Sequence, residues 1–312
     1  MNICITGALG HIGSALIRNI STLSVDKVYL VDNFFTQRYA SLFDLPDGVN
    51  YRFHEMDILS DDIAPIIKDS DILIHLAAVT NAEASFYNRS IVEEINKKGL
   101  EKIARFCAEY GCSLIFPSST SVYGMQEELV TEDCAEKDLK PQSPYAESKL
   151  YGERLLKTLS ERNNLKFVIF RLGTIFGYSI GMRFHTAVNK FIWQASLGQD
   201  ITVWKTALNQ KRPYCGLNDS INAFNYAVKA GIFDCKIYNI VTTNLTVNDI
   251  LNVIKEYAPG INLKFVDSPI MNQLSYNASN ARSIERGFKY SDFLNDSVRE
   301  TIDKLKNAKT IS

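Results

Sequence analysis

The chain has 312 residues, of which 46% are apolar and 22% are charged, as in an ordinary soluble globular protein. Its 34 Lys and Arg nearly balance 35 Asp and Glu, and the net charge of -1 argues against nucleic-acid and anionic-membrane surfaces. Six cysteines occur without a C-x-x-C pair or a histidine cluster, so no metal site is expected. Without a leader-like segment or a run of about 18 apolar residues, we expect a cytoplasmic protein without a membrane partner.

Short apolar runs alternate with longer helical patterns over most of the chain. Most of these runs lack polar alternation, which is typical of strands buried on both faces of a parallel sheet. The alternation predicts a doubly wound α/β fold. The expected strands are 2–6, 27–32, 51–57, 72–77, 113–119, 166–173 and 237–241, and the expected helices lie near 11–20, 88–110, 144–162, 185–197, 218–230, 246–257 and 296–308.

The first expected strand leads into the glycine-rich segment CITGALGHIGSALI, which contains Gly7, Gly10 and Gly13. Glycines at this point allow a tight turn, close approach of backbone N–H groups to a pyrophosphate, and close helix–strand packing. The spacing is G-x-x-G-x-x-G, whereas the commonest dinucleotide fingerprint is G-x-G-x-x-G. Taken alone, such a turn could be purely structural.

Asp32 ends the second expected strand, about 20 residues after the glycine turn, where a carboxylate can accept hydrogen bonds from the adenine ribose. A carboxylate there repels a 2′-phosphate, which favours NAD over NADP, and the adjacent Asn33 adds no positive charge. Arg38 follows six residues after Asp32 and keeps the choice of cofactor open. The turn and Asp32 together predict a dinucleotide site.

A second constellation begins at SPYAESKLYGE, residues 143–153. Ser143 is a good helix N-cap and Pro144 a good first helical residue, so Tyr145 and Lys149 stack one turn apart on the same face. A tyrosine has a pKa of about 10, and a neighbouring ammonium lowers the pKa toward the range in which a phenolate can act as a base. The alternative is a half-buried tyrosine beside a solvated lysine.

Hydroxyl side chains provide a third element in FPSSTSVYG, residues 116–124. Ser118, Ser119 and Thr120 follow a late parallel strand, and open α/β sheets bind ligands at the carboxyl ends of their strands. These hydroxyls can hold a sugar hydroxyl or a ketone, although a Ser/Thr cluster alone is usually turn chemistry.

In combination, the residues resemble the extended short-chain dehydrogenase/reductase family, in its branch of NAD-dependent nucleotide-sugar epimerases and dehydratases, similar to UDP-glucose 4-epimerases. The resemblance implies a Rossmann domain over 1–173, to which a strand and helix near 212–242 return, and a smaller, interleaved α/β substrate-binding region over 174–312. The segments that carry it are TGALGHIG (6–13), VDN (31–33), MDI (56–58), HLAA (75–78), INKKG (95–99), SSTSVYG (118–124), YAESK (145–149), RLGTIFG (171–177) and RPYCGLND (212–219).

The resemblance also implies roles for individual residues. Tyr145 would be the base, Lys149 would bind the nicotinamide ribose, and Ser119 matches the catalytic Ser/Thr position. The implied cofactor-binding residues are Gly7, Gly10, His11, Ile12, Gly13, Asp32, Asn33, Asp57, Ile58, Leu76, Ala77, Ala78, Asn96, Ser118, Tyr145 and Lys149, and the implied substrate-binding residues are Thr80, Ser119, Thr120, Thr174, Arg183 and Arg212. Arg183 and Arg212 are candidates for the substrate diphosphate, because a guanidinium donates two parallel hydrogen bonds to phosphate oxygens.

Two departures from the family pattern narrow the chemistry. Dehydratases of this branch carry Asp and Glu directly after the catalytic Ser/Thr, whereas this chain has Thr120 and Ser121, which argues against dehydration. Thr174 stands where many relatives have an Asn that contacts the sugar nucleotide.

The resulting hypothesis is NAD-dependent epimerization of a nucleoside-diphosphate sugar at C4, through a transient 4-keto sugar. The alternatives are a nucleotide-sugar 4-ketoreductase or dehydrogenase of the same family, and a non-catalytic dinucleotide sensor. Relatives dimerise through two long helices per subunit, so the resemblance implies a homodimer through 88–110 and 144–162.

Overall fold

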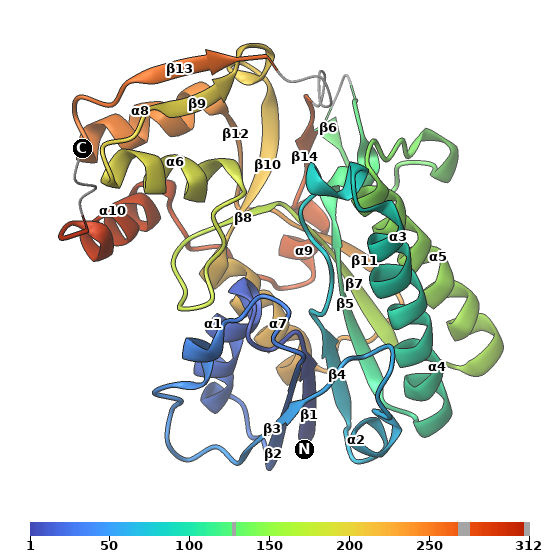
Figure 1. Ribbon diagram of the computed structural model, residues 1–312. Coiled ribbons are helices and arrows are strands. Elements are labelled where there is room, and N and C mark those ends of the chain that lie inside the picture. Colours follow the sequence, from blue (N-terminus) through green and yellow to red (C-terminus); the bar gives the residue numbers. More distant parts are fainter. Residues whose placement is uncertain (127–128, 268–274, 309–312) are drawn as a thin grey trace.

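The computed structural model describes residues 1–126, 129–267 and 275–308 (Figure 1). Its central sheet has seven parallel strands in the order β11-β7-β5-β4-β1-β2-β3. The strands are β1 (Asn2–Thr6), β2 (Lys27–Asp32), β3 (Tyr51–Glu55), β4 (Ile72–His75), β5 (Ser113–Ser119), β7 (Phe167–Leu172) and β11 (Ile237–Ile240). The predicted doubly wound α/β fold is therefore confirmed, and all seven expected strands are present, several of them one or two residues shorter.

Strand order reverses at β1, which pairs with β2 on one side and with β4 on the other. In an open parallel sheet, such a reversal leaves a crevice beyond the carboxyl ends of the two central strands. The glycine turn follows β1 and the HLAA segment follows β4, so both predicted cofactor segments reach this crevice.

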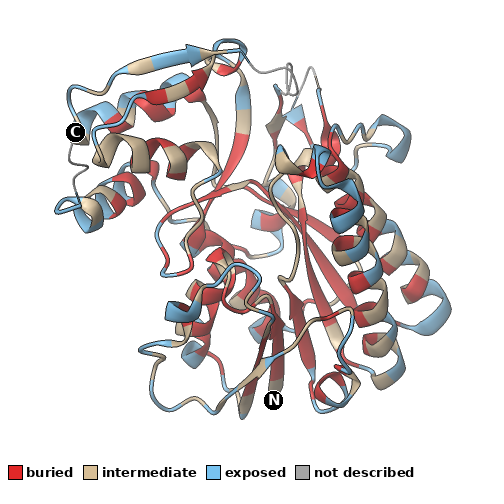
Figure 2. Ribbon diagram, viewed as in Figure 1, coloured by how far each residue is buried: buried red, intermediate tan, exposed pale blue. Residues whose placement is uncertain are grey.

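Helices cover both faces of the sheet. One face packs against α1 (His11–Asn19) and α7 (Leu217–Ala230), and the other against α2 (Ala64–Lys68), α4 (Leu100–Tyr110) and α5 (Pro144–Asn163). The strands are buried along most of their length, whereas the outer sides of α4 and α5 are exposed (Figure 2). This two-sided burial explains why the strands read as nearly continuous apolar runs.

The helix expected over 88–110 is divided into three parts. It comprises α3 (Arg89–Val92), a π-helical segment (Glu93–Gly99) and α4, and it ends at Gly111 with a φ of +73°. A side chain at Gly99 would come within 2.7 Å of the Ile58 Cδ1 atom. The π-helical segment therefore brings the backbone against the end of the cofactor crevice.

The second region consists of small sheets and three helices around a core of their own. Its elements are β8 (Thr174–Phe176), β10 (Lys211–Gly216) and β12 (Thr243–Thr246) in one sheet, β9 (Ile201–Trp204) and β13 (Leu263–Val266) in another, and α6 (Ala187–Ser196), α8 (Val247–Tyr257) and α10 (Leu294–Leu305). The helices match the predicted ones, but the sequence analysis missed these strands, because they are short and several are half-exposed.

The two regions are interleaved along the chain. β11 pairs with β7 in the main sheet, and α7 packs against α1, whereas β10 lies between β8 and β12 in the second region. The short strands β6 (Leu129–Val130) and β14 (Asn277–Ala278) pair with each other, and α9 (Ala281–Glu285) follows them.

The described ranges contain neither a candidate membrane-spanning helix nor a candidate metal-binding group. None of their helices combines the length and the apolarity needed to cross a membrane. Their His, Cys, Asp and Glu side chains form no group of three or more that could hold a metal ion.

Candidate active site

The glycine turn lies directly against the end of β4. Gly7 has a φ of +66°, and a Cβ atom there would lie 2.5 Å from the backbone nitrogen of Ala77. A Cβ at Gly13 would lie 2.5 Å from the Ala8 carbonyl oxygen. Gly10 is the N-cap of α1. Glycine at these positions therefore lets the turn pack against β4 and lead into the N-terminus of α1, and a helix N-terminus favours a pyrophosphate.

Asp32 ends β2 beside this turn. Its Oδ2 atom accepts a hydrogen bond from the Leu9 N–H at 3.1 Å, and its Oδ1 atom accepts one from the Phe34 N–H at 3.0 Å. Asn33 donates from Nδ2 to Asp57 Oδ2 at 2.8 Å. These bonds hold the carboxylate at the mouth of the crevice, where its remaining lone pairs can accept bonds from ribose hydroxyls.

A hollow of about 120 Å³ connects these segments. The predicted cofactor residues that line it are Gly7, Gly10, Asp32, Asn33, Asp57, Ile58, Leu76, Ala77 and Ala78, and they are joined by Val31, Phe35, Thr36, Arg38, Met56, Val79 and Ile95. Most residues of the second group were not predicted, because they lack the motif spacing of the first. Their signal is position, since nearly all of them directly follow β2, β3 or β4.

Arg38 is the positively charged residue in the lining of this hollow. Its Nη1 atom donates to Thr36 Oγ1 at 3.1 Å and lies 3.9 Å from the position of a Cβ on Gly10. Burial lowers the pKa of Arg38, whereas the charge of Asp32 raises it. The guanidinium is therefore close to both the acidic residue and the glycine turn.

Several predicted cofactor residues lie outside the lining of the hollow. Asn96 accepts from the Val79 N–H at 2.8 Å and donates to the Val79 carbonyl at 3.0 Å, so it supports the wall. His11 binds the Gly177 carbonyl through Nε2 at 2.8 Å, and Ile12 packs against the main core. Their direct contact with a cofactor, like that of Gly13 and Ser118, stays a prediction.

Tyr145 and Lys149 lie in the first two turns of α5, which Ser143 caps by accepting from the Ala146 N–H at 3.1 Å. The Lys149 Nζ atom is 5.8 Å from the centre of the Tyr145 ring and donates to the Pro117 carbonyl at 2.8 Å. Tyr145 is half-buried, whereas Lys149 is buried. The predicted stacking of the two side chains is present, and Lys149 also binds the end of β5.

The electrostatic environment of Tyr145 differs from the sequence-based expectation. Burial raises the pKa of Tyr145, and the opposing influences are the positive charge of Arg183 and a hydrogen bond with Ser119. The pKa of Lys149 is lowered to about 7, first by burial and then by the charge of Arg183, against the opposing charge of the Glu153 carboxylate. Arg183 is thus a second cation near Tyr145 besides Lys149, and its charge opposes the effect of burial on the pKa of Tyr145.

Three predicted hydroxyl groups lie near Tyr145 but differ in their surroundings. The Ser119 Oγ atom accepts from the Ser121 hydroxyl at 2.9 Å and faces Tyr145. Thr120 is buried, and its hydroxyl donates to the Leu172 carbonyl at 3.4 Å. Thr174 is half-buried at the start of β8. Ser119 is therefore the hydroxyl of this set that the structure places next to the predicted base.

The two predicted substrate arginines lie in different places. Arg183 donates from Nη1 to Thr80 Oγ1 at 2.5 Å, and its buried Nε atom has no hydrogen-bond partner among the described residues. Arg212 is half-buried in β10 and donates to Gln210 at 3.5 Å. Arg183 is thus brought together with Tyr145 and Thr80, whereas Arg212 lies on the second region.

The fold and the arrangement of these segments can now be compared with known proteins. A family model described as the NAD dependent epimerase/dehydratase family matches residues 3–240. The chain belongs to this family. Its cofactor is NAD, and the glycine turn before α1 and the Asp32 carboxylate at the end of β2 fit that cofactor.

Among curated proteins, the chain is 29% identical over 206 residues to the uncharacterized UDP-glucose epimerase YtcB of Bacillus subtilis. This alignment covers 63% of the chain and 64% of that protein, so somewhat less than two thirds of its length is matched. The chain is also 25% identical over 182 residues to a UDP-glucose 4-epimerase of Streptococcus mutans, with 57% of the chain and 53% of that protein covered.

Solved structures agree over almost the whole chain. The UDP-glucuronic acid 4-epimerase of Bacillus cereus, in complex with UDP-glucuronic acid and NAD, matches with a TM-score of 0.89, 24% identity and coverage of 98% of this chain and 99% of that one. The UDP-glucose 4-epimerase of Thermus thermophilus, in complex with NAD, matches with a TM-score of 0.83, 23% identity and coverage of 99% and 100%. At these identities the matches establish the fold.

Proposed function

We propose that the chain is an NAD-dependent epimerase of a UDP-sugar that inverts C4. The observation that carries this proposal is the convergence of Tyr145, Ser119 and Lys149 at the carboxyl end of β5, without an acid after Ser119. Thr120 and Ser121 stand where a dehydratase needs carboxylates, so elimination of water lacks its acid and base.

The chain's own residues have distinct tasks in such a reaction. Tyr145 takes the proton of the sugar hydroxyl and later returns it, while Ser119 holds the same oxygen by a hydrogen bond. Lys149 binds the cofactor ribose and Arg183 stabilises the phenolate. NAD, when bound, accepts and returns the hydride, so it is not consumed. Holding the reacting groups in contact supplies much of the rate.

The position of Arg183 favours a sugar that carries a carboxylate. Its guanidinium lies close enough to influence Tyr145, and its buried Nε atom retains an unused donor. Because Tyr145 marks the reacting carbon, Arg183 faces the sugar rather than the diphosphate, and Arg212 becomes the diphosphate candidate. A guanidinium recognises a carboxylate by parallel hydrogen bonds. The name of the Bacillus cereus protein, a UDP-glucuronic acid 4-epimerase, agrees with this choice.

The test is turnover without added cofactor. Purified chain is incubated with UDP-glucuronic acid, UDP-glucose and the corresponding GDP-, CDP- and dTDP-sugars, and the products are identified by NMR. We expect the C4 epimer of the uronic acid, with no net NADH formed. Stoichiometric consumption of NADH or NADPH would instead support the alternative, a 4-ketoreductase or dehydrogenase.

Tyr145→Phe separates catalysis from sensing. It removes the phenolic proton carrier, so kcat should fall by about a thousandfold or more, while NAD binding stays within about twofold. A wild-type chain that binds NAD but converts none of the sugars would favour a dinucleotide sensor.

We further propose a cytoplasmic homodimer that forms through the exposed outer sides of α4 and α5. Light scattering on the purified chain would check the dimer, and Phe106→Glu on α4 should shift it toward monomer, because Phe106 is partly exposed there.

A further inference from the structure

A buried ion pair lies directly behind the predicted catalytic residues. Glu153 follows Lys149 by one turn of α5, and Arg171 lies on β7. The guanidinium donates from Nε to Glu153 Oε1 at 3.0 Å and from Nη2 to Oε2 at 2.7 Å. The two side chains are only 3% and 2% exposed. Burying two charges gains little stability in itself, so the pair calls for another role.

One hydrogen bond connects the pair to the end of β5, and a second connects the neighbouring Lys149 to the same strand. Ser118 stands opposite Arg171 in the sheet register and donates its hydroxyl to Glu153 Oε1 at 2.5 Å. Pro117 accepts from Lys149 at 2.8 Å. Two successive residues of β5 are therefore bonded to two successive turns of α5, and the next residue of β5 is Ser119.

This geometry sets the relative position of the catalytic groups. Tyr145 and Lys149 move with α5, whereas Ser119 moves with β5. Sliding of α5 along β5 by one ångström would break the bonds at Pro117 and Ser118 and would separate Ser119 from Tyr145. Because hydride and proton transfer need near-contact geometry, such a shift would reduce turnover strongly.

Glu153 also acts on Lys149 through its charge. The groups that face Lys149 are Tyr145 and Glu153 on α5, Arg183 in the loop before α6, and His75 at the end of β4. Burial and Arg183 lower the pKa of Lys149, and the Glu153 carboxylate raises it. His75 is uncharged near neutral pH, because burial lowers its pKa to about 3.

We propose that Glu153, held by Arg171, is a positioning residue that aligns Lys149 and Ser119 with Tyr145. The proposal rests on the proposed function only for its kinetic readout. The position of Ser118 in this network assigns it a structural link to Glu153 in place of direct contact with the cofactor.

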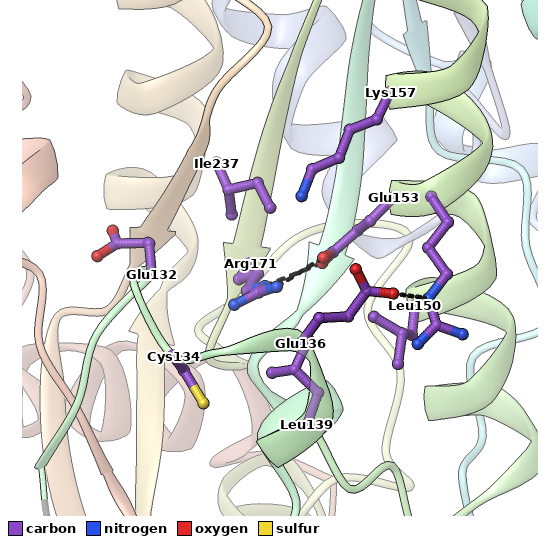
Figure 3. A pocket seen from close by; sticks show the side chains of 10 residues that line it. Glu132, Cys134, Glu136, Leu139, Leu150, Glu153, Lys157, Arg171 and Ile237 are labelled. Atoms are coloured by element: carbon purple, nitrogen blue, oxygen red, sulfur yellow. Dashed lines mark hydrogen bonds and ion pairs between the residues drawn. The ribbon is translucent and has the colours of Figure 1, made fainter.

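A matched control is available in the same pocket (Figure 3). A pocket of about 90 Å³ is lined by both Glu153 and Glu136, and Glu136 pairs with Arg154 at 2.6 Å in an exposed ion pair. Glu136→Gln removes this neighbouring pair without affecting the bonds at β5. We expect it to leave kcat and the pH dependence unchanged.

Glu153→Gln keeps an acceptor for Ser118 but removes the charge. We expect kcat to fall by about tenfold with KM for the sugar nucleotide within about twofold. The alkaline limb of kcat should move to lower pH by about one unit, because Lys149 loses its proton more readily without the carboxylate. A loss of folding stability alone would lower the active fraction and leave this limb where it is.

The shift in the pH at which Lys149 loses its proton can also be measured without turnover. NAD affinity, measured by calorimetry at a series of pH values, should change around the pKa of Lys149, and this change should occur at lower pH in Glu153→Gln. This measurement stays informative if no sugar is converted, so failure of the proposed function and failure of this proposal are distinguishable.

Ser118→Ala provides a second route if Glu153→Gln does not fold. It leaves the ion pair intact and removes the link to β5, so we expect kcat to fall severalfold with an unchanged alkaline limb. Wild-type kcat in Ser118→Ala would overturn the positioning role. The electrostatic effect of Glu153 on Lys149 would be overturned by a different result. In that case Glu153→Gln and Glu136→Gln would show the same alkaline limb of kcat and the same pH dependence of NAD binding.

Discussion

The cofactor half and the sugar half of the cleft are built by different means. The cofactor hollow is formed by short segments that directly follow β1, β2, β3 and β4, so each segment is placed by the sheet itself. The sugar half depends on the loop after β8, which carries Arg183, and on β10, which carries Arg212. A rigid sheet edge makes the first half recognisable from motifs, whereas the second depends on how a separate region packs against it.

The two halves are joined at the glycine turn. The loop after β8 lies on α1, since Ser179 donates to the His11 carbonyl at 2.8 Å and Gly181 donates its N–H to Ser14 Oγ at 3.0 Å. A Cβ at Gly181 would lie 2.5 Å from the Leu9 carbonyl oxygen. The loop that carries Arg183 is thereby held against the same turn that faces the cofactor.

The largest effect, on NAD affinity, is expected for Gly7→Ala, because Gly7 lies in the cofactor half of the cleft, which the central sheet positions. The added Cβ would lie 2.5 Å from the Ala77 nitrogen on a backbone with a φ of +66°. We expect NAD affinity to fall by more than about a hundredfold, as measured by calorimetry. Gly231→Ala is the control, since it has a φ of +63° but open space around it. Equal NAD affinity in the two variants would refute a packing role for Gly7.

Arg183→Gln tests the sugar half and should have an intermediate effect. If Arg183 binds a carboxylate, kcat/KM for UDP-glucuronic acid should fall by about thirtyfold more than kcat/KM for UDP-glucose. Arg212→Gln, which is expected to weaken diphosphate binding, should affect both substrates equally. Equal losses of kcat/KM for both sugar nucleotides in Arg183→Gln would contradict carboxylate binding by Arg183 and would favour its binding to the diphosphate.

Acidification tests the folding stability of the cleft through two buried histidines, of which His11 binds the second region at Gly177. Burial lowers the pKa of both His11 and His75 to about 3, so both are uncharged in the folded chain. An unfolded histidine takes up a proton near pH 6.5, so stability is complete above that pH and is lost as the pH falls toward 3. At pH 5 each histidine should cost about 2 kcal/mol of unfolding free energy, measured by urea unfolding. Between pH 7 and pH 5, His75→Gln should lose less unfolding free energy than the wild type. Equal losses in the two proteins would contradict a buried, uncharged His75.

The cofactor half was predictable from the sequence, whereas much of the sugar half was not. The parallel sheet, the glycine turn and Asp32 were recognisable, because local spacing and strand ends suffice to place them. The strands β8, β10 and β12 were missed, because they have only three to six residues each and show no clear period. Lys149 lies beside Tyr145 as predicted, but the second cation, Arg183, was not expected there, since it lies 38 residues away along the chain and no spacing rule connects the two.

The sequence by itself determined the fold class, the family and the chemical types at the site: glycines for a phosphate turn, an acid for a ribose, and a Tyr and a Lys one turn apart. Tertiary structure alone decided which groups face one another. Arg183 approaches Tyr145, Glu153 pairs with Arg171, and His11 binds the Gly177 carbonyl. The physical reason is that hydrogen bonds and charges act over a few ångströms in space, and only packing brings distant segments within that range.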